Sequence, residues 1–180
     1  MVPVRTVIDL THVITPGMPV YPGTEPPTLQ EATTVERDGF AEKRVCFYSH
    51  TGTHVDAPAH MLAGGLRLDA YDAGYFVGEA CVVDVAGHHL VPTAALAAHD
   101  ALLDGCAFVL LHTGWARYWG HERYFHGFPV LSVDAARWLV ARGVRGVGVD
   151  AISVDPVDST TFENHHELFR AGRITIENLR

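Results

Sequence analysis

Short apolar runs alternate with amphipathic segments along the chain, and this pattern predicts the secondary-structure elements. Runs rich in β-forming residues predict strands over 4–10, 43–50, 79–86, 106–112, 144–149 and 173–178. Segments bounded by helix start and stop signals predict helices over 93–103, 132–142 and 163–171. Thr93 and Ser132 are the expected N-caps of the first two helices.

The order of these elements predicts the fold class. Strands and helices alternate over 79–178, which is typical of an α/β fold with a largely parallel sheet. The first 60 residues are expected to hold strands and loops without helices, so the sheet should be mixed and close toward a barrel. The proline-rich segment 11–27 should be a long loop, a kind that is often functional. No repeat or low-complexity linker divides the chain, and one domain over 1–180 is expected.

The composition argues against several function classes. The chain has 180 residues, and 48% of them are hydrophobic, which is enough to form a core. Thirteen Lys and Arg against 21 Asp and Glu give a net charge of −8, which argues against binding to nucleic acid or to an anionic membrane. We find neither an apolar run of membrane-spanning length nor a signal-peptide pattern.

The three cysteines indicate a reducing compartment. Cys46, Cys81 and Cys106 are far apart in the sequence, lie in apolar stretches and form no C-x-x-C pair. The sequence therefore predicts neither a disulfide nor a cysteine-type zinc site. We expect three small buried hydrophobic residues in a cytoplasmic protein.

Twelve histidines are the unusual feature of the composition, and their placement indicates chemistry. Four candidate metal ligands fall within 49–60, namely His50, His54, Asp56 and His60. A zinc-binding helix of the H-E-x-x-H type is not expected, because Thr51 occupies the position of its glutamate and Pro58 disfavours a helix. The alternative is that these histidines are ordinary side chains satisfied by hydrogen bonds.

An extended conformation of the segment 49–60 would also bring these candidate ligands together. In an extended segment His54 and Asp56 point to the same side, and Gly52 allows the bend that brings His50 to the same centre. Two imidazoles and a carboxylate form a nitrogen and oxygen site that suits Zn²⁺, Mn²⁺ or Fe²⁺.

A second segment near the end of the chain offers further ligands. His165 or His166 falls in the first turn of the last expected helix. Glu177 lies on the following strand, on the same face as Thr175.

The stretch from His50 to His60 resembles the H-x-G-T-H-x-D-x-P-x-H signature of the cyclase family of metal-dependent hydrolases, which includes bacterial kynurenine formamidases and isatin hydrolases. Further matches follow the family's order, namely 9–12, 18–23, 112–115, 148–150 and 153–155. His165 and Glu177, twelve residues apart, match the last two ligands of the family. The resemblance therefore covers nearly the whole chain.

This resemblance implies a site for two divalent ions per subunit, Zn²⁺ first and Mn²⁺ as the alternative. It assigns His50, His54 and Asp56 to the first ion, with Asp56 bridging to a second ion. His165 would bind that second ion, and Glu177 would contact both. It also implies a barrel-like sheet flanked by helices, of the swivelling β/β/α type.

The resemblance further implies hydrolysis of a small-molecule amide, of the arylformamidase or cyclic-amide type. A metal-bound hydroxide would attack the carbonyl, and His60 would pass a proton to the leaving amine. His60 could instead be a ligand of the second ion. A metal-dependent cyclase or lyase is the alternative reaction, and a purely structural metal site is a third possibility.

Three departures from the family pattern bear on the substrate and the fold. Tyr21 stands where kynurenine formamidases place a tryptophan against the substrate ring, so we expect Tyr21 to bind a flat substrate. Val55 and Met61 match the general form of the signature and not its formamidase form. Family members usually continue into further strands after the Glu-Asn-Leu of 177–179, so the resemblance implies that C-terminal strands are missing here.

The remaining candidates are expected to be structural. We place His12 and His112 among structural residues, and His166 on an exposed helix face. The tryptophans, Trp115, Trp119 and Trp138, are expected in the core. Asp150 and Asp155 are either carboxylates that orient a ligand histidine or turn and cap residues. By resemblance the protein should form a homodimer or homotetramer.

Overall fold

A five-stranded mixed sheet is the centre of the computed structural model, which describes residues 6–180. The strands, in spatial order, are β3 (His54–Asp56), β9 (Ile174–Glu177), β8 (Gly146–Val149), β6 (Phe108–His112) and β4 (Ala80–Asp84). The four strands from β9 to β4 run parallel, and β3 is antiparallel to β9. The expected α/β class and the alternation of strands and helices over 79–178 are confirmed.

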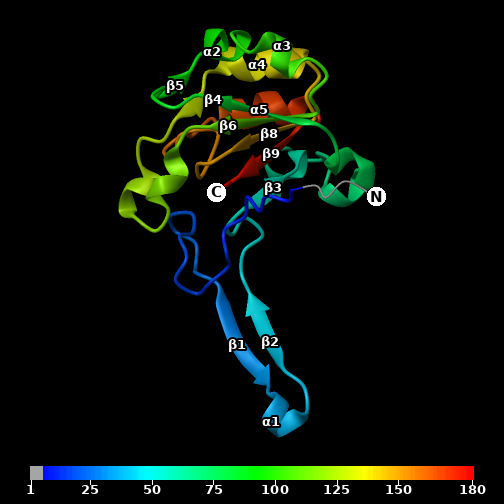
Figure 1. Cartoon of the computed structure of the whole chain (residues 1–180), viewed down its shortest axis with the longest axis vertical. Coiled ribbons are helices and arrows are strands. Elements are labelled where there is room, and N and C mark those ends of the chain that lie inside the picture. The colour runs from blue at the N-terminus through cyan, green and yellow to red at the C-terminus, as the bar shows by residue number, and fades with distance from the viewer. Residues whose placement is uncertain (1–5) are drawn as a thin grey trace.

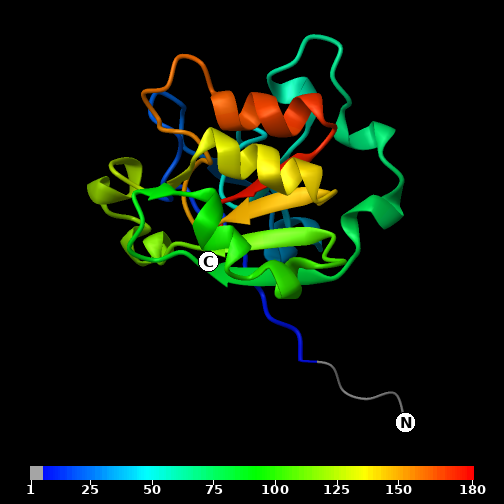
Figure 2. The same ribbon diagram turned by 90° about the horizontal axis from the view of Figure 1, so that it is seen from above.

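Helices pack on one face of this sheet, as Figures 1 and 2 show. They are α2 (Thr93–Ala97), α3 (Asp100–Leu103), α4 (Val133–Ala141) and α5 (Glu163–Arg170). The core between the two layers includes Val83, Val109 and Val147 from the strands and Leu139 and Leu168 from the helices, all fully buried. Burial of these aliphatic side chains is the main stabilising contribution to the domain.

The helix ends agree only in part with the expected caps. Ser132 caps α4 as expected, since its Oγ accepts a hydrogen bond from the N–H of Ala135 at 3.2 Å. The single helix expected over 93–103 is instead two short helices. Thr93 is the first helical residue, and Pro92 occupies the N-cap position without a side-chain hydrogen bond.

Glycines let β8 lie between its neighbours. All four residues of the Gly-Val-Gly-Val strand are buried. A Cβ atom on Gly148 would lie 2.5 Å from Leu110 Cδ2 and 2.9 Å from Leu179 Cδ1, closer than real Cβ contacts. Only glycine therefore permits this packing of β8 against β6 and the chain after β9.

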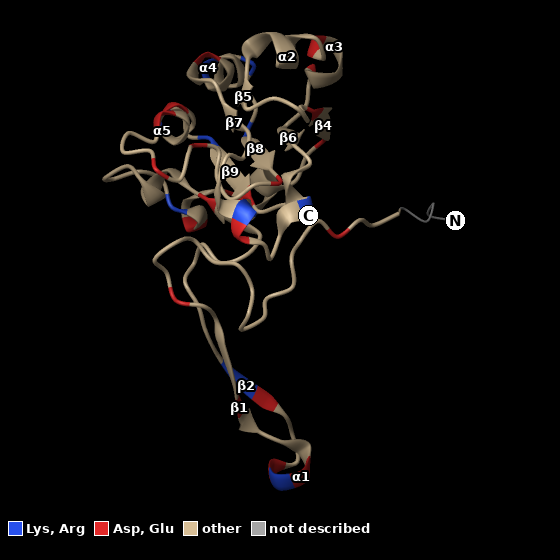
Figure 3. Cartoon of the chain, turned by 90° about the vertical axis from the view of Figure 1, so that its left-hand side faces the viewer, with Lys and Arg blue, Asp and Glu red and all other residues tan. Residues whose placement is uncertain are grey.

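A hairpin arm projects from the body on the side opposite the helices (Figures 1 and 3). It consists of β1 (Thr28–Thr33), α1 (Val35–Asp38) and β2 (Glu42–Cys46), with the two strands antiparallel. The helix α1 corrects the expectation that the first 60 residues lack helices. Strand β2 also ends earlier than the expected strand over 43–50, because the chain turns at 49–52 toward the sheet.

The chain before the arm has no helix or strand among the described residues. The expected strand over 4–10 lies partly outside them, and its described part, 6–10, forms no strand. Val7 and Ile8 in this part are exposed, so no sheet edge pairs with it. The segment 11–27 is a loop, as expected. A parallel pair, β5 (Leu90–Val91) and β7 (Val130–Leu131), completes the fold.

Within residues 6–180, β3 and β4 each pair with one neighbour, so the expected barrel-like closure is not confirmed. None of the described helices is both long and apolar enough for a transmembrane span.

The cysteines differ from the expectation. Cys81 and Cys106 form a disulfide, with their Cα atoms 6.2 Å apart, although 25 residues separate them in the sequence. Cys81 lies in β4 and Cys106 just before the neighbouring strand β6, so the pairing of these strands places them near each other, which sequence spacing alone does not reveal. Cys46 is free and exposed on the arm and is therefore not a buried hydrophobic residue.

Candidate metal centre

A bend and a short strand position the histidine cluster. Gly52 has a φ of +67°, which favours glycine, and a Cβ atom there would lie 2.8 Å from Met18 Cε. The following strand β3 pairs with β9 so that His54 lies opposite Glu177 and Asp56 opposite Thr175. The extended conformation expected for this segment is therefore confirmed. The register of β3 against β9 brings together ligand candidates more than 100 residues apart.

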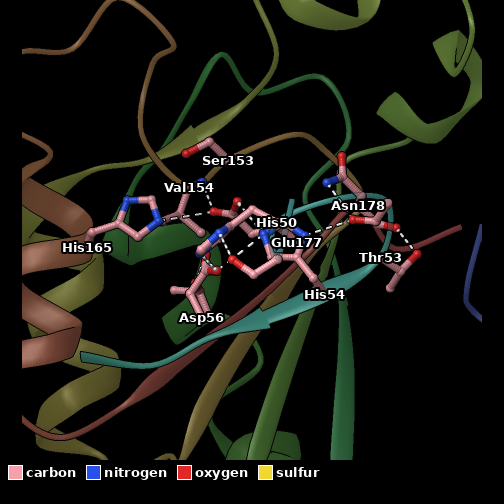
Figure 4. Close-up of polar contacts among 12 residues, drawn as sticks. His50, Thr53, His54, Asp56, Ser153, Val154, His165, Glu177 and Asn178 are labelled. Atoms are coloured by element: carbon pink, nitrogen blue, oxygen red, sulfur yellow. Dashed lines mark hydrogen bonds and ion pairs between the residues drawn. The ribbon is translucent and has the colours of Figure 1, made fainter. Parts of the chain in front are cut away.

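Asp56 lies at the centre of the candidate site, only 2% exposed (Figure 4). Its Oδ1 lies 2.8 Å from His50 Nε2 and 3.2 Å from His54 Nε2. Its Oδ2 accepts a hydrogen bond from the hydroxyl of Thr175 at 3.1 Å. Thr175 thus holds one carboxylate oxygen and leaves the other facing two imidazoles.

Two compact groups of possible metal ligands share this carboxylate. In one, donor atoms of His50, Asp56 and His60 lie within 4.8 Å of one another. In the other, donor atoms of His54, Asp56 and Glu177 do so. A carboxylate common to two donor groups is an arrangement that can hold two ions side by side.

Unsatisfied polar atoms at this point fit a cation. His54 Nε2 and Asp56 Oδ1 are buried, and although they lie within ion-pair distance of each other, neither makes a well-aligned hydrogen bond among the described residues. Leaving such atoms unpaired costs free energy, and a metal ion would satisfy both. Imidazole and carboxylate donors match the preferences of Zn²⁺ and Mn²⁺.

His165 contacts the candidate metal centre by way of the Glu177 carboxylate. Its Nε2 lies 3.1 Å from Glu177 Oε1, and its Nδ1 lies 2.7 Å from Asp155 Oδ2. The carboxylate of Asp155 also accepts the backbone N–H groups of Asn164 and His165, so it caps α5. His165 belongs to neither compact group, but its Nε2 is aimed at them. Asp155 therefore both orients a ligand candidate and caps a helix.

The charges at the site shift the pKa values of three residues. Burial disfavours the charged form of His165, but Asp155 and Glu177 outweigh burial and raise its pKa to about 10. Burial likewise opposes protonation of His54, yet the carboxylates of Asp56 and Glu177 raise its pKa. Burial would raise the pKa of Asp56, but His50 and His54 hold it well below its usual range.

His60 differs from the other histidines of the site. Its ring centre lies 4.0 Å from that of His50 and 6.4 Å from that of His165. Burial lowers its pKa, and the neighbouring histidines add to this effect against the opposing charge of Asp56. An imidazole held neutral beside a metal centre can accept a proton or bind a metal ion.

A cavity of about 530 Å³ opens onto these residues. Aromatic side chains form much of its wall, namely Tyr21, Tyr48, Trp119, Tyr124 and Phe162. Tyr21 lies in the wall as expected for a substrate contact, and its hydroxyl donates a hydrogen bond to Val157 O at 3.2 Å. A cavity with aromatic walls and a polar floor suits a flat organic molecule.

Two expectations about the surroundings of the site are wrong. Trp119 is not a core residue, because it lines the cavity and stacks on His12 with ring centres 3.7 Å apart. His166 is not on an exposed face, because it also lines the cavity and its Nδ1 is buried without a partner among the described residues. Helix periodicity alone could not reveal a cavity formed by distant loops.

The remaining candidates are structural. His112 is exposed beside Asp84 and does not line the cavity. Asp150 accepts the backbone N–H groups of Thr113 and Trp115, so it fixes a turn.

Three polar residues at the site were missed at the sequence level. Thr175 contacts Asp56, and Asn178 joins the Gly52 bend to Tyr124. The alternation that places Thr175 beside Glu177 on one strand face was the available signal for the first contact. The contacts of Asn178 and Tyr124 are long-range and left no local signal.

Comparisons with known proteins show the family to which this chain belongs. The profile of the Cyclase family, described as "Putative cyclase", matches residues 8–156. A kynurenine formamidase of Bacillus cytotoxicus is 31% identical over 173 residues, which cover 96% of this chain and 81% of that protein.

Solved structures of metal-dependent hydrolases are also similar to this chain. A potential metal-dependent hydrolase with cyclase activity is 32% identical, with a TM-score of 0.79 over 96% of this chain and 81% of the other. An isatin hydrolase bound to the product analogue thioisatinate shares the fold at 21% identity, with a TM-score of 0.82 over 96% and 78% of the two chains. The profile match covers most of the chain, and the protein therefore belongs to the Cyclase family.

Proposed function

We propose that the protein is a metal-dependent hydrolase of non-peptide amides, of the arylformamidase or cyclic-amide type. The observation that carries this proposal is the buried Asp56 carboxylate shared by two groups of possible ligands, whose Oδ1 faces the Nε2 atoms of His50 and His54. The relatives named as a kynurenine formamidase and a potential metal-dependent hydrolase support the same reaction class.

Five side chains would hold the metal ions in this proposal, namely His50, His54, Asp56, His165 and Glu177. We propose two divalent ions per subunit, Zn²⁺ first and Mn²⁺ second, because imidazole and carboxylate sites accept both. When bound, such ions would supply a Lewis acid that activates water and polarises a carbonyl.

His60 would move the proton that the leaving amine requires. Its ring lies beside His50 at the open side of the site, and its lowered pKa keeps the imidazole neutral near pH 7. A neutral imidazole can take a proton from the attacking water and return it to the nitrogen of the broken amide bond. The place of His60 in the donor group of His50 and Asp56 supports the alternative role of metal ligand.

Tyr21 and the other aromatic walls would bind a flat substrate. The hydroxyl of Tyr21 is held by Val157 O, which leaves the ring as its contribution to the cavity. Burial and the charge of Glu177 raise the pKa of Tyr21, so its phenol stays neutral. An aromatic wall of this kind supports an aryl amide or a fused cyclic amide as the substrate.

A cyclase or lyase reaction remains the second candidate, supported by the description of one structural neighbour as having cyclase activity. It would use the same ions to polarise a carbonyl without net hydrolysis. Incorporation of oxygen from labelled water into the product separates the two reactions, because only hydrolysis incorporates it.

The hairpin arm supports a homodimer or homotetramer. An isolated two-stranded hairpin is marginally stable in water, and this arm exposes Val35, Phe40, Val45 and Phe47. A second subunit would cover these side chains.

Three further features belong to the proposal. We propose a single domain over 1–180, supported by one sheet that joins strands from His54 to Glu177. We propose its barrel-like closure, of the swivelling β/β/α type, on the family resemblance alone. We also propose a cytoplasmic location. The Cys81–Cys106 disulfide argues against this part of the proposal, because disulfides are rare in that compartment.

The direct test is a substrate panel run after metal reconstitution. We expect the Zn²⁺- or Mn²⁺-loaded protein to hydrolyse N-formylkynurenine, isatin or a related aryl amide, and the chelator-treated protein to be inactive. His54→Ala should lose metal and activity together. Full activity of His54→Ala, or of the metal-free protein, would contradict the proposal.

A further inference from the structure

We propose that Asn178 is a positioning residue of the candidate metal centre, which acts on His54 through the carbonyl group of Gly52. The inference rests on the proposed function in that it takes His54 as a metal ligand. Asn178 directly follows Glu177 and is 4% exposed. Its side chain lies beside the bend that precedes His54, at the edge of the site near Thr53 (Figure 4).

The hydrogen bonds of Asn178 determine how its amide is oriented. Its Nδ2 donates to Gly52 O at 3.0 Å, and its Oδ1 accepts from the hydroxyl of Tyr124 at 2.8 Å. A carbonyl oxygen can only accept, so the amide nitrogen must face Gly52 and the amide oxygen must face Tyr124. Tyr124 is fully buried, and burial raises the pKa of its phenol, which therefore keeps the proton that it donates.

The same carbonyl oxygen determines the tautomer of His54. His54 Nδ1 lies 2.8 Å from Gly52 O, and because that oxygen can only accept, Nδ1 must carry the proton. Nε2 is then the nitrogen that remains available to a metal ion, and it lies 3.2 Å from Asp56 Oδ1. Hydrogen bonds to the far nitrogen of a histidine orient it as a metal ligand.

The backbone of Asn178 ties the two ligand segments together. Its φ of 56° lies in the left-handed region, which asparagine tolerates better than most residues. Its carbonyl accepts a hydrogen bond from the hydroxyl of Thr53, and its N–H donates to Ala151 O at 2.9 Å. One residue therefore connects the strand that carries Glu177 with both residues that precede His54.

Loss of the Asn178 amide should release the Gly52 carbonyl. That group would be free to rotate toward water, and His54 would lose the fixed acceptor that holds its ring. Removal of such an outer contact typically weakens metal binding by about 10- to 100-fold. We expect an effect of this size for Asn178 and a smaller one for Tyr124, which acts only on the amide.

The experiment measures Zn²⁺ affinity by chelator competition in the full chain. Asn178→Gly keeps the left-handed backbone accessible and removes the amide, and Tyr124→Phe removes a single hydroxyl. Tyr75→Phe is the matched control, because its hydroxyl donates to Arg145 O and Gly172 O away from the site. We expect Zn²⁺ affinity to fall about 10- to 100-fold in Asn178→Gly, less in Tyr124→Phe, and not in Tyr75→Phe.

A second readout separates positioning from general stability. The ¹⁵N shifts of the two ring nitrogens of His54 report its tautomer directly, in the metal-free and the Zn²⁺-loaded protein. At a pH at which His54 is neutral, wild type and Tyr75→Phe should show the proton on Nδ1, and Asn178→Gly and Tyr124→Phe should show a mixture of tautomers. Unchanged affinity together with an unchanged tautomer in both site variants would overturn the inference. Absence of Zn²⁺ binding in wild type would instead contradict the proposed function. The tautomer of His54 in the metal-free protein would then still test whether Asn178 positions that ring.

Discussion

At the scale of single residues, the site depends on carboxylates that fix imidazoles. Asp56 faces His50 and His54 with one oxygen, and Asp155 holds His165 by its Nδ1. The ligand cluster itself could be predicted from sequence, because four of its donors lie within eleven residues. The supporting contacts could not, since Thr175 is 119 residues from Asp56 and Asn178 is 126 from Gly52.

The buried His165 predicts how the stability of the metal-free protein depends on pH. Its folded-state pKa of about 10 lies above the ordinary value of 6.5. The protonated imidazole therefore stabilises the fold fully below pH 6.5, and this contribution is lost as the pH rises toward 10. Urea unfolding with chelator present, across this range, should show the free energy of unfolding falling more steeply in wild type than in His165→Gln. Equal slopes in the two proteins would contradict the charge arrangement.

The two roles considered for His60 predict different results for His60→Asn. We expect His60 to move the proton, so the variant should keep its metal content and lose about 10²- to 10⁴-fold in kcat. Metal content is measured by mass spectrometry alongside the rate, and loss of one ion per chain would assign His60 as a ligand instead.

At the scale of elements, two arrangements bring the site together: the register of β3 against β9 and the capped start of α5. A shift of one residue in that register would turn His54 and Asp56 away from the site. The alternation of strands and helices over 79–178 was predictable from apolar runs and capping residues. The arm helix α1 was not, because four residues are too few for a periodic signal. The break between α2 and α3 was not predictable either.

The double role of Asp155 predicts a difference between two cap variants. Ser132→Ala removes the cap of α4, and Asp155→Asn weakens the cap of α5 and the contact with His165. Both should lower the free energy of unfolding, by about 1 kcal/mol for Ser132→Ala. Only Asp155→Asn should also weaken metal binding, by about 10- to 100-fold. Equal metal affinities in the two variants would show that Asp155 acts as a cap alone.

At the scale of the whole molecule, the hairpin arm extends away from the layered body (Figures 1 and 3). The fold class was predictable from the order of elements. The arm and the Cys81–Cys106 pairing were not, because both depend on how separate segments meet in space. The aromatic cavity likewise draws its wall from loops spread over most of the sequence.

The exposed arm predicts association between subunits. Val35 and Phe40 are 60% and 57% exposed near its tip, so charged replacements there should leave the fold of the chain intact. We expect wild type to sediment as a dimer or tetramer, and Val35→Glu with Phe40→Glu to sediment as a smaller species with the same circular dichroism. A wild-type monomer at all concentrations would contradict the role given to the arm.

The central claim is that Asp56 serves two metal ions that carry out amide hydrolysis. The most direct measurement is the metal content and hydrolytic rate of wild type and Asp56→Asn, with the exposed Asp84→Asn as the control. The account predicts that wild type and Asp84→Asn bind two divalent ions per chain and hydrolyse an aryl or cyclic amide. Asp56→Asn should lose both the bound metal and the hydrolytic activity. An Asp56→Asn protein that retains two ions and full activity would contradict it.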